Sequence, residues 1–274
     1  MRGILTIVSL AMTMAAEAAG PRIVSLAPCL DTVLVRLADH DQIAALSRYA
    51  RDARGFTIAA EAATLPVTAG TAEELIALKP DIVLTAFLLP AATMQVLAGF
   101  EIEVRHFPLP ETVAANLAEV RAIADLIVQS ARGDTLIADI EAAMAAAARQ
   151  PNQMPIEALV FQANGFASAP GTLMDELMAR TGFANAAVRF GLSQSGYVAL
   201  ERLIAAPPRM LLVGDAVNNL PAWADRVTAH PALAALDDRV IRAPFPAKYL
   251  YCGGPVIVPA VAALAKARAM AGSP

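Results

Sequence analysis

Short apolar segments alternate with helix-forming segments along most of this chain. Apolar or β-branched runs at residues 23–26, 42–46 and 82–85 are separated by helical patterns that include residues 31–37 and 72–78. The alternation returns after residue 155, where runs at 158–162 and 210–213 accompany helical patterns at 173–180, 198–205 and 255–270. Because strands that are buried on both faces read as continuous apolar runs, this order predicts parallel sheets covered by helices.

A long stretch without strand character separates the two sets. Residues 111–149 have a helical pattern, and the segment 132–134 predicts the end of one helix and the start of another, with Asp134 as the cap. The Ala-rich segment 135–149 contains no helix breaker, so we expect it to form a stiff connector. The predicted fold is α/β, with two lobes of mainly parallel sheet joined by a single long α-helix. The lobes are expected at 19–130 and 153–274, and the connecting helix within 131–152.

The first residues have the pattern of an export signal. Arg2 is followed by an apolar run over residues 4–16, and Ala16-Glu17-Ala18 has the small-x-small spacing of a cleavage site. The run is too short to span a membrane. We therefore predict that residues 1–18 are a signal peptide and that the mature protein resides in the periplasm.

Charge and motifs exclude several classes of function. The formal net charge of the 274 residues is −4, whereas a nucleic-acid-binding protein needs a basic face. The sequence has no GxGxxG after a strand, and no GxxxxGK[ST], HExxH or GxSxG motif. These features favour a monomeric protein that binds a small ligand between two lobes over an exported α/β enzyme, which remains the least favoured alternative.

Four segments resemble the periplasmic binding proteins of ABC importers for vitamin B12, iron-siderophores and haem. They are residues 21–28, 78–84, 169–173 and 252–255, and they occur in the order and spacing of that family. The resemblance implies two α/β lobes bridged by one helix and a ligand held in the cleft between them. It also implies no enzymatic activity and no intrinsic cofactor, because a metal chelate brings its own iron or cobalt. Delivery would be to an ABC permease in the inner membrane.

A weak internal repeat places Glu73 and Glu201 at matching positions, each seven residues before a proline. In proteins similar to this one, a glutamate on each lobe docks onto arginines of the permease, so the resemblance assigns this role to Glu73 and Glu201. Separated carboxylates are suited to orienting a partner. The alternative is that each is an acidic first-turn residue favoured by the helix dipole.

Ligand contacts are expected in the loops that follow the strands, because ligands collect at the carboxyl ends of parallel strands. Arg side chains there offer a planar donor fork for anionic groups, and aromatic rings offer stacking. In the second lobe, Trp223 is a further aromatic candidate, although it is expected to pack locally. The candidate ligand-binding residues are Pro28, Cys29, Asp31, Arg48, Tyr49, Arg51, Phe87, Asn164, Tyr197, Lys248, Tyr249, Tyr251 and Cys252. Asp31 has a second interpretation as a helix cap.

Cys29 and Cys252, the only cysteines, are placed on opposite lobes near the cleft. They are expected either to form a disulfide, as is common in exported proteins, or to remain thiols that ligate a bare or loosely chelated metal; a third alternative is no shared role. Haem-binding members of the family offer a tyrosine just ahead of the helix near residue 72, and residues 67–71 contain none. The sequence also departs from the family pattern at Cys29, where small hydroxyl residues are common, and at Val256, where a basic residue often stands.

Overall fold

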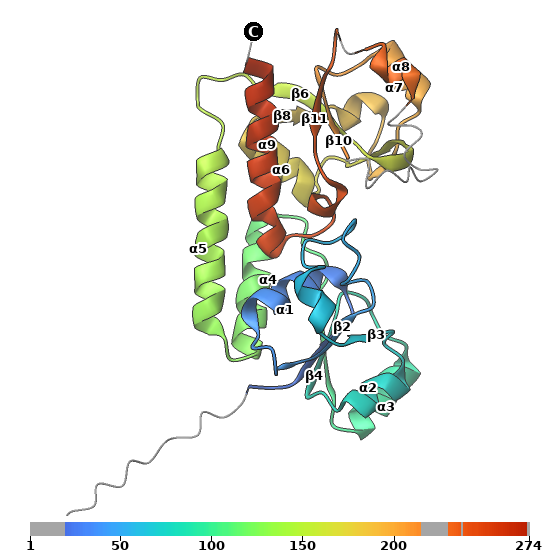
Figure 1. Cartoon of the computed structure of the whole chain (residues 1–274), viewed down its shortest axis with the longest axis vertical. Helices are drawn as coiled ribbons and strands as arrows, with labels where there is room; N and C mark the ends of the chain where they lie inside the picture. The colour runs from blue at the N-terminus through green and yellow to red at the C-terminus, as the bar shows by residue number, and fades with distance from the viewer. Residues whose placement is uncertain (1–19, 215–229, 237, 273–274) are drawn as a thin grey trace, which may run out of the picture.

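The computed structural model describes residues 20–214, 230–236 and 238–272, and it shows two parallel sheets placed one beyond the other along a pair of long helices (Figure 1). This arrangement confirms the predicted fold class. The predicted signal peptide and Trp223 lie outside the described residues. The residue boundaries assigned to the lobes stay a prediction.

The first lobe is built on a five-stranded parallel sheet with the order β3-β2-β1-β4-β5. Its strands β1, β2 and β4 are the three apolar runs of the sequence and are buried along their length. The edge strand β5 is mostly exposed, which is why it lacks an apolar signature. The elements are β1 (Ile23–Ser25), α1 (Pro28–Leu37), β2 (Ile43–Ser47), β3 (Val67–Thr68), α2 (Ala72–Leu78), β4 (Ile82–Thr85), α3 (Ala91–Gly99) and β5 (Glu103–His106).

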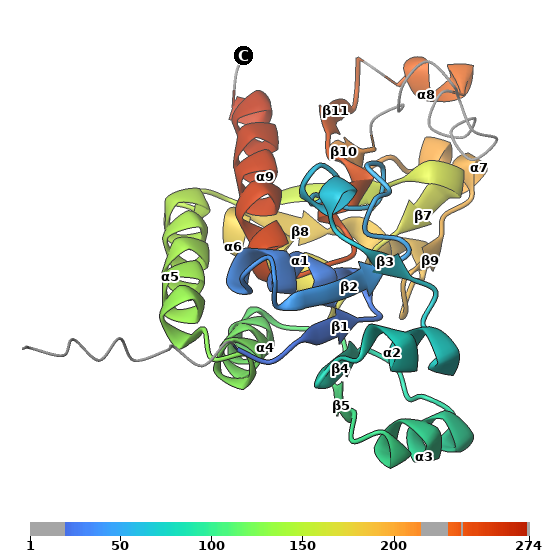
Figure 2. The same ribbon diagram turned by 60° about the horizontal axis from the view of Figure 1, so that its bottom comes forward.

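The second lobe contains a four-stranded parallel sheet with the order β11-β10-β6-β8 and a short antiparallel pair, β7 with β9. Figure 2 shows both strands in the second lobe, on the side that carries α7. The elements are β6 (Ile156–Phe161), β7 (Phe166–Ala167), α6 (Leu173–Thr181), β8 (Phe183–Asn185), β9 (Gly196–Tyr197), α7 (Leu200–Ala205), β10 (Met210–Val213), α8 (Pro231–Ala234), β11 (Ile241–Pro244) and α9 (Ile257–Gly272).

Two helices, α4 (Val113–Leu126) and α5 (Ser130–Ala147), lead from the first lobe to the second. The predicted break at Arg132-Gly133-Asp134 is wrong, because the chain turns at residues 127–129, where Val128 has a φ of 62°. Gly133 is instead buried inside α5. A Cβ at this position would lie 2.4 Å from Ala124 Cβ on α4, so the glycine permits the close approach of the two helices rather than ending one. Asp134 is not a cap but pairs with Arg121 at 2.5 Å.

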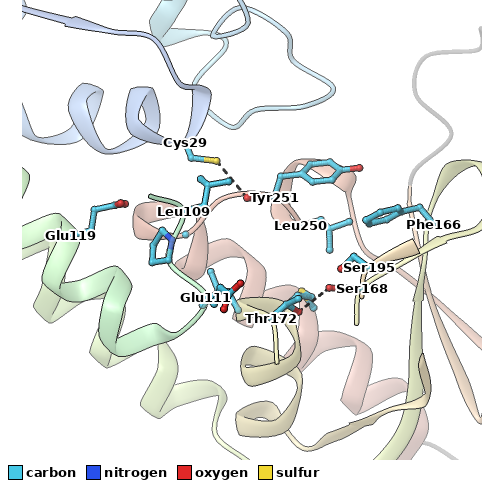
Figure 3. A pocket seen from close by; sticks show the side chains of 14 residues that line it. Cys29, Leu109, Glu111, Glu119, Phe166, Ser168, Thr172, Ser195, Leu250 and Tyr251 are labelled. Carbon is cyan, nitrogen blue, oxygen red and sulfur yellow. Dashed lines mark hydrogen bonds between the residues drawn. The ribbon is translucent and has the colours of Figure 1, made fainter. Parts of the chain in front are cut away.

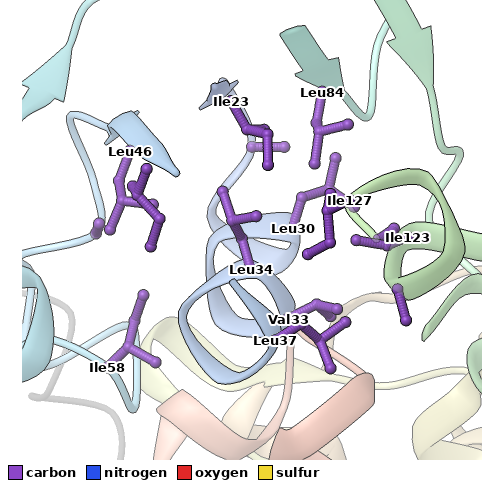
Figure 4. Packing of buried hydrophobic residues seen from close by; sticks show 14 of the residues in the cluster. Ile23, Leu30, Val33, Leu34, Leu37, Leu46, Ile58, Leu84, Ile123 and Ile127 are labelled. Atoms are coloured by element: carbon purple, nitrogen blue, oxygen red, sulfur yellow. The ribbon is translucent and has the colours of Figure 1, made fainter. Parts of the chain in front are cut away.

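The connecting helix α5 contributes to the hydrophobic cores of both lobes. Ile137 packs in the core of the first lobe, whereas Ile140 and Met144 pack in the core of the second. Figure 4 shows the first core, in which the leucines of α1 lie between the sheet and α4. Because one rigid helix is buried in both cores, we expect bending between the lobes to be small.

The C-terminal helix α9 belongs to the second core. With the preceding turn it is the one described helix long and apolar enough, by length and composition alone, to cross a membrane. Its buried residues Ile257, Val261 and Leu264 pack in the second core, and α9 lies against α5, α6 and β11. Its apolar character is therefore explained by packing inside the lobe.

Candidate functional site

A cavity of about 300 Å³ lies at the junction of the two lobes, where loops that follow the carboxyl ends of strands converge. The first lobe and α4 supply one wall and the second lobe supplies the other, as Figure 3 shows. The lining residues are Cys29, Leu109, Pro110, Glu111, Glu119, Phe166, Ser168, Thr172, Leu173, Met174, Ser195, Leu250, Tyr251 and Gly253.

A disulfide between Cys29 and Cys252 links the lobes at one end of the cavity. Cys29 lies in the first turn of α1, and Cys252 lies in the turn ahead of α9; their Cα atoms are 5.0 Å apart. Of the alternatives left open by the sequence, the structure shows the disulfide. The assignment of Cys29 and Cys252 as thiol ligands of a metal is therefore corrected, because joined sulfurs are not thiolates. Within the described ranges, no group of three or more His, Cys, Asp or Glu side chains is placed to hold a metal ion.

A buried hydrogen bond reinforces this junction. Asn116 on α4 accepts a hydrogen bond of 2.9 Å from the Gly254 backbone N–H, and its amide nitrogen donates 2.9 Å to the Thr112 carbonyl. Gly254 has a φ of 56°, and a Cβ there would lie 2.9 Å from Val33 on α1. Glycine is therefore required for this close approach. The segment that carries Tyr251 and Cys252 is held against the first lobe by a covalent bond, a hydrogen bond and tight packing.

Three aromatic rings form a cluster on the second-lobe side of the cavity. The Phe166 ring centroid lies 5.9 Å from that of Tyr197 in an edge-to-face arrangement and 6.3 Å from that of Tyr251. Tyr197 and Tyr251 remain 69% and 52% exposed, so their rings are available for contact. Burial, and then the neighbouring Tyr197, raise the pKa of Tyr251, so its hydroxyl is protonated at neutral pH. Such rings suit a large, flat ligand surface with polar groups at its edge.

Hydroxyl groups lie below the aromatic cluster in Figure 3. Ser195 Oγ accepts a hydrogen bond of 3.1 Å from the Ala169 N–H, which leaves the serine proton free to donate to a ligand. Thr172 Oγ1 donates to the Ala169 carbonyl at 2.9 Å and also contacts Ser168 Oγ at 3.1 Å. These groups can orient a ligand that carries hydrogen-bond acceptors.

Two carboxylates also line the cavity. Glu111 precedes α4 and is exposed, whereas Glu119 is half-buried on α4. Burial raises the pKa of the Glu119 carboxyl to about 7. No basic side chain in the described part of the chain pairs with Glu119, and Figure 3 shows its carboxylate directed toward the cavity.

Of the predicted ligand-binding residues, the structure places Cys29 and Tyr251 in the cavity wall. Tyr49 and Phe87 are exposed at the carboxyl ends of β2 and β4 but do not line the cavity. Tyr197 reaches the site only through its contact with Phe166. The remaining predicted residues, which also lie outside the lining, are Pro28, Asp31, Arg48, Arg51, Asn164, Lys248, Tyr249 and Cys252.

Asp31 needs a correction in both of its predicted roles. It is fully buried, and it accepts hydrogen bonds from the backbone N–H of Ser47 at 3.2 Å and from Ser47 Oγ at 2.6 Å. Its carboxylate therefore ties α1 to the end of β2; it neither lines the cavity nor caps the free N–H groups of its helix. Burial raises the pKa of Asp31 to about 6, although hydrogen bonds from Ser25 and Ser47 oppose the effect.

The basic candidates have partners within the protein. Arg51 donates to the backbone carbonyls of Ala62 and Leu65 at 3.2 and 2.7 Å, so it secures the loop ahead of β3. Arg48 donates to the Tyr49 hydroxyl at 2.6 Å.

Three further candidates occupy the second lobe. Lys248 Nζ lies 5.8 Å from the centroid of the Tyr249 ring, and that ring packs edge-to-face on Phe245. Tyr249 is thus a packing residue. Asn164 is exposed, with a φ of 59° in the turn between β6 and β7.

Glu73 and Glu201 occupy the first turns of α2 and α7, and both are exposed. Both views show α2 and α7 on the same side of the molecule, one on each lobe (Figures 1 and 2). The neighbouring Glu74 has a structural role, because it accepts a hydrogen bond of 2.8 Å from the Ala69 N–H and another from Thr68 Oγ1. Glu74 therefore secures the start of α2, and Glu73 remains available at the surface.

Sequence reasoning missed most of the cavity wall. Phe166 lies two residues beyond the predicted residue Asn164, and Thr172 lies within the motif at 169–173. Ser195 belongs to a segment that reads as an ordinary polar turn. Glu119 gave no signal, because one glutamate in a helical pattern normally faces solvent.

Comparisons with known proteins agree with this fold. Residues 23–245 match the family described as Periplasmic binding protein. The haem-binding protein RhuT from Roseiflexus sp. RS-1 is 22% identical, with a TM-score of 0.67 over 90% of this chain and 99% of that one. The haem-binding protein HutB of Vibrio cholerae is 18% identical, with a TM-score of 0.72 over 90% and 98%.

The vitamin B12 binding protein BtuF of Vibrio cholerae is 17% identical, with a TM-score of 0.66 over 93% of this chain and 99% of that one. No curated protein sequence matches the chain significantly. The family consists of binding proteins rather than enzymes, and its members act as solute-binding components of ABC import. On the evidence of its two-lobed fold, its inter-lobe cavity and a family match over most of its length, this chain belongs to the periplasmic binding proteins.

Proposed function

We propose that the protein captures a metal chelate of the iron-siderophore or corrinoid class in the cavity between its lobes and delivers it to an ABC permease in the inner membrane. The observation that carries the proposal is the cavity itself, whose wall combines aromatic rings, hydroxyls and residues of both lobes. A volume of about 300 Å³ is at the lower end of the range for ligand pockets. We infer that the cavity holds one part of a large chelate and that the exposed rings of Tyr49, Phe87 and Tyr197 contact the rest.

The haem-binding and B12-binding neighbours support a metal chelate as the ligand. The segment ahead of α2 argues against haem in this chain. Thr68 and the backbone of Ala69 and Gly70 donate hydrogen bonds to Glu74, and no tyrosine stands in residues 67–71. We therefore favour an iron-siderophore or a corrinoid, with iron or cobalt carried by the ligand.

The proposed partner is a permease that receives Glu73 and Glu201. Their exposure, their matching positions in the two lobes and the separate structural task of Glu74 support this role. Two carboxylates far apart orient a partner better than one, since each fixes one end of the contact. We further propose that residues 1–18 are removed on export and that the protein acts as a monomer.

The test begins with purification of the protein from its native periplasm, followed by absorption spectroscopy and mass spectrometry of the bound material. A ferric chelate or a corrinoid is the expected result. The dissociation constant of the identified chelate is then measured for wild type, Tyr251→Ala and Phe100→Ala. Phe100 is a matched control, because it is an exposed aromatic residue outside the cavity wall.

Tyr251→Ala is expected to raise the dissociation constant by about tenfold or more, as truncation of a central aromatic contact commonly does. Phe100→Ala should leave it unchanged. If the native ligand carries no metal, or if the two variants bind it equally well, the proposal is wrong.

A further inference from the structure

We propose that the cavity selects neutral or cationic chelates and discriminates against polyanionic ones; the inference rests on the chelate-binding function proposed above. The juxtaposition that carries it is a half-buried glutamate, a second glutamate and a set of hydroxyls around a cavity to which no Lys, Arg or His of the described residues contributes. The sequence alone favoured anionic ligand groups, because the loop after β2 contains two arginines, Arg48 and Arg51.

Glu119 is the central residue of this argument. It lies on α4, one turn beyond Asn116, and its carboxylate faces the cavity below Cys29 (Figure 3). Its burial raises its pKa to about 7, which indicates a poorly solvated site with no compensating cation among the described residues. A ligand that brings a positive charge or a hydrogen-bond donor would compensate this carboxylate, whereas a ligand carboxylate or catecholate would add like charge.

The basic residues around α4 are paired with other groups. Arg121, on α4 itself, pairs with Asp134 on α5 at 2.5 Å. On α6, Arg180 pairs with Glu176 at 2.7 Å, and on α1, Arg36 pairs with Glu61 at 3.0 Å.

The loop arginines are equally engaged. Arg51 is bound to two backbone carbonyls, and Arg48 lies 4.8 Å from the centroid of the Tyr49 ring. Neither lines the cavity. The charge that a deeply bound ligand meets is therefore set by Glu119 and Glu111.

The rest of the wall fits the same class of ligand. The Ser195 hydroxyl has a free proton, and the protonated Tyr251 hydroxyl is a second donor. These neutral donors suit the amide or hydroxamate oxygens of an uncharged or cationic chelate. Neither hydroxyl supplies the full positive charge that several ligand carboxylates would need.

The experiment compares probes that differ in charge. Dissociation constants are measured by calorimetry for ferric desferrioxamine B, which is cationic, for cyanocobalamin, which is neutral, and for haemin and a ferric tricatecholate, which are anionic. The measurements are made at about pH 8, above the pKa of about 7 of Glu119, so that its carboxylate is charged, and wild type is compared with Glu119→Gln, which removes this charge but keeps the shape. Glu141→Gln, on the exposed face of α5 outside this cavity, is the matched control.

We expect at least one cationic or neutral probe to bind at least about tenfold more tightly than either anionic probe, which is the size of one partly screened charge interaction. Glu119→Gln should reduce this preference severalfold, whereas Glu141→Gln should preserve it. Circular dichroism melts of both variants establish that each is folded.

The inference is overturned if an anionic probe binds most tightly, or if Glu119→Gln leaves the preference unchanged. The proposed function survives either result unless the tightest probe is haemin, which would contradict our preference for an iron-siderophore or a corrinoid. If the wild type binds none of the probes and its native ligand is not a chelate, the proposed function itself fails.

Discussion

The disulfide between Cys29 and Cys252 leads to a prediction about stability. It joins residues 223 positions apart and closes most of the chain into one loop. In the chain-entropy treatment of cross-links, a loop of this length restricts the unfolded chain by about 5 kcal/mol at 25 °C. Changing both cysteines to alanine is therefore expected to lower the free energy of unfolding by up to about that amount. Both are changed together, because a single change leaves a reactive thiol.

Calorimetric melts measure the effect. For a protein of this size, each kcal/mol corresponds to roughly 2–4 °C in melting temperature, so the double variant should melt about 10–20 °C below the oxidised wild type. Treatment of the wild type with a phosphine reductant should lower its melting temperature toward that of the variant. The variant provides the control, because the reductant should not affect it.

Two results would refute this reasoning. One is a thiol titration that finds two free thiols in the native, unreduced protein, which would mean that the bond does not form. The other is a variant that melts within about 2 °C of the oxidised wild type. The second result would show that Asn116, Gly254 and the packing of Val33 already hold the lobes together without the covalent link.

Three further predictions concern single residues. Burial raises the pKa of Asp31 from 3.8 to about 6, so the folded state favours the protonated form. The contribution of this carboxyl to the free energy of unfolding is complete below pH 3.8 and is lost as the pH rises through 6. In denaturant titrations between pH 4 and 7, Asp31→Asn should therefore remove up to roughly 3 kcal/mol of the pH dependence of the unfolding free energy. Asn116→Ala leaves the buried Gly254 N–H without its acceptor and should cost about 1–3 kcal/mol of unfolding free energy, whereas Asn152→Ala, at an exposed position, should be neutral. Glu73→Arg should reduce the rate of ligand transport through the permease without changing the dissociation constant of the ligand. A transport rate equal to that of the wild type would rule out the docking role.

Local sequence determined the elements whose ends carry their own signals. The helix at residues 72–78 begins after Thr71, whose side chain accepts a hydrogen bond from the Glu74 N–H, and ends at Lys79, which precedes a proline. Its predicted bounds are confirmed, as are those of the strands at 82–85 and 210–213. The edge strand β5 was missed, since its sequence, Glu-Val-Arg-His, has no continuous apolar run. The helix α3 was missed as well, because it is apolar around its whole circumference and shows little helical periodicity.

Contacts between residues far apart in the sequence could not be predicted from local patterns. Gly133 reads as a break in the sequence, but in the structure it is the point where α5 approaches α4. Arg51 reads as a ligand contact, but backbone carbonyls of its own lobe take its donors.

The sequence by itself determined that this protein alternates strands with helices in two sets and that a stiff helix joins them. These properties depend on residues close together in the chain. Only the tertiary structure decided that Cys29 is bonded to Cys252, that Asp31 is sealed in the core and that Glu119 faces the cavity. The reason is that each of these outcomes depends on how the lobes and α4 pack together, and the residues next to each site in the sequence do not specify that packing.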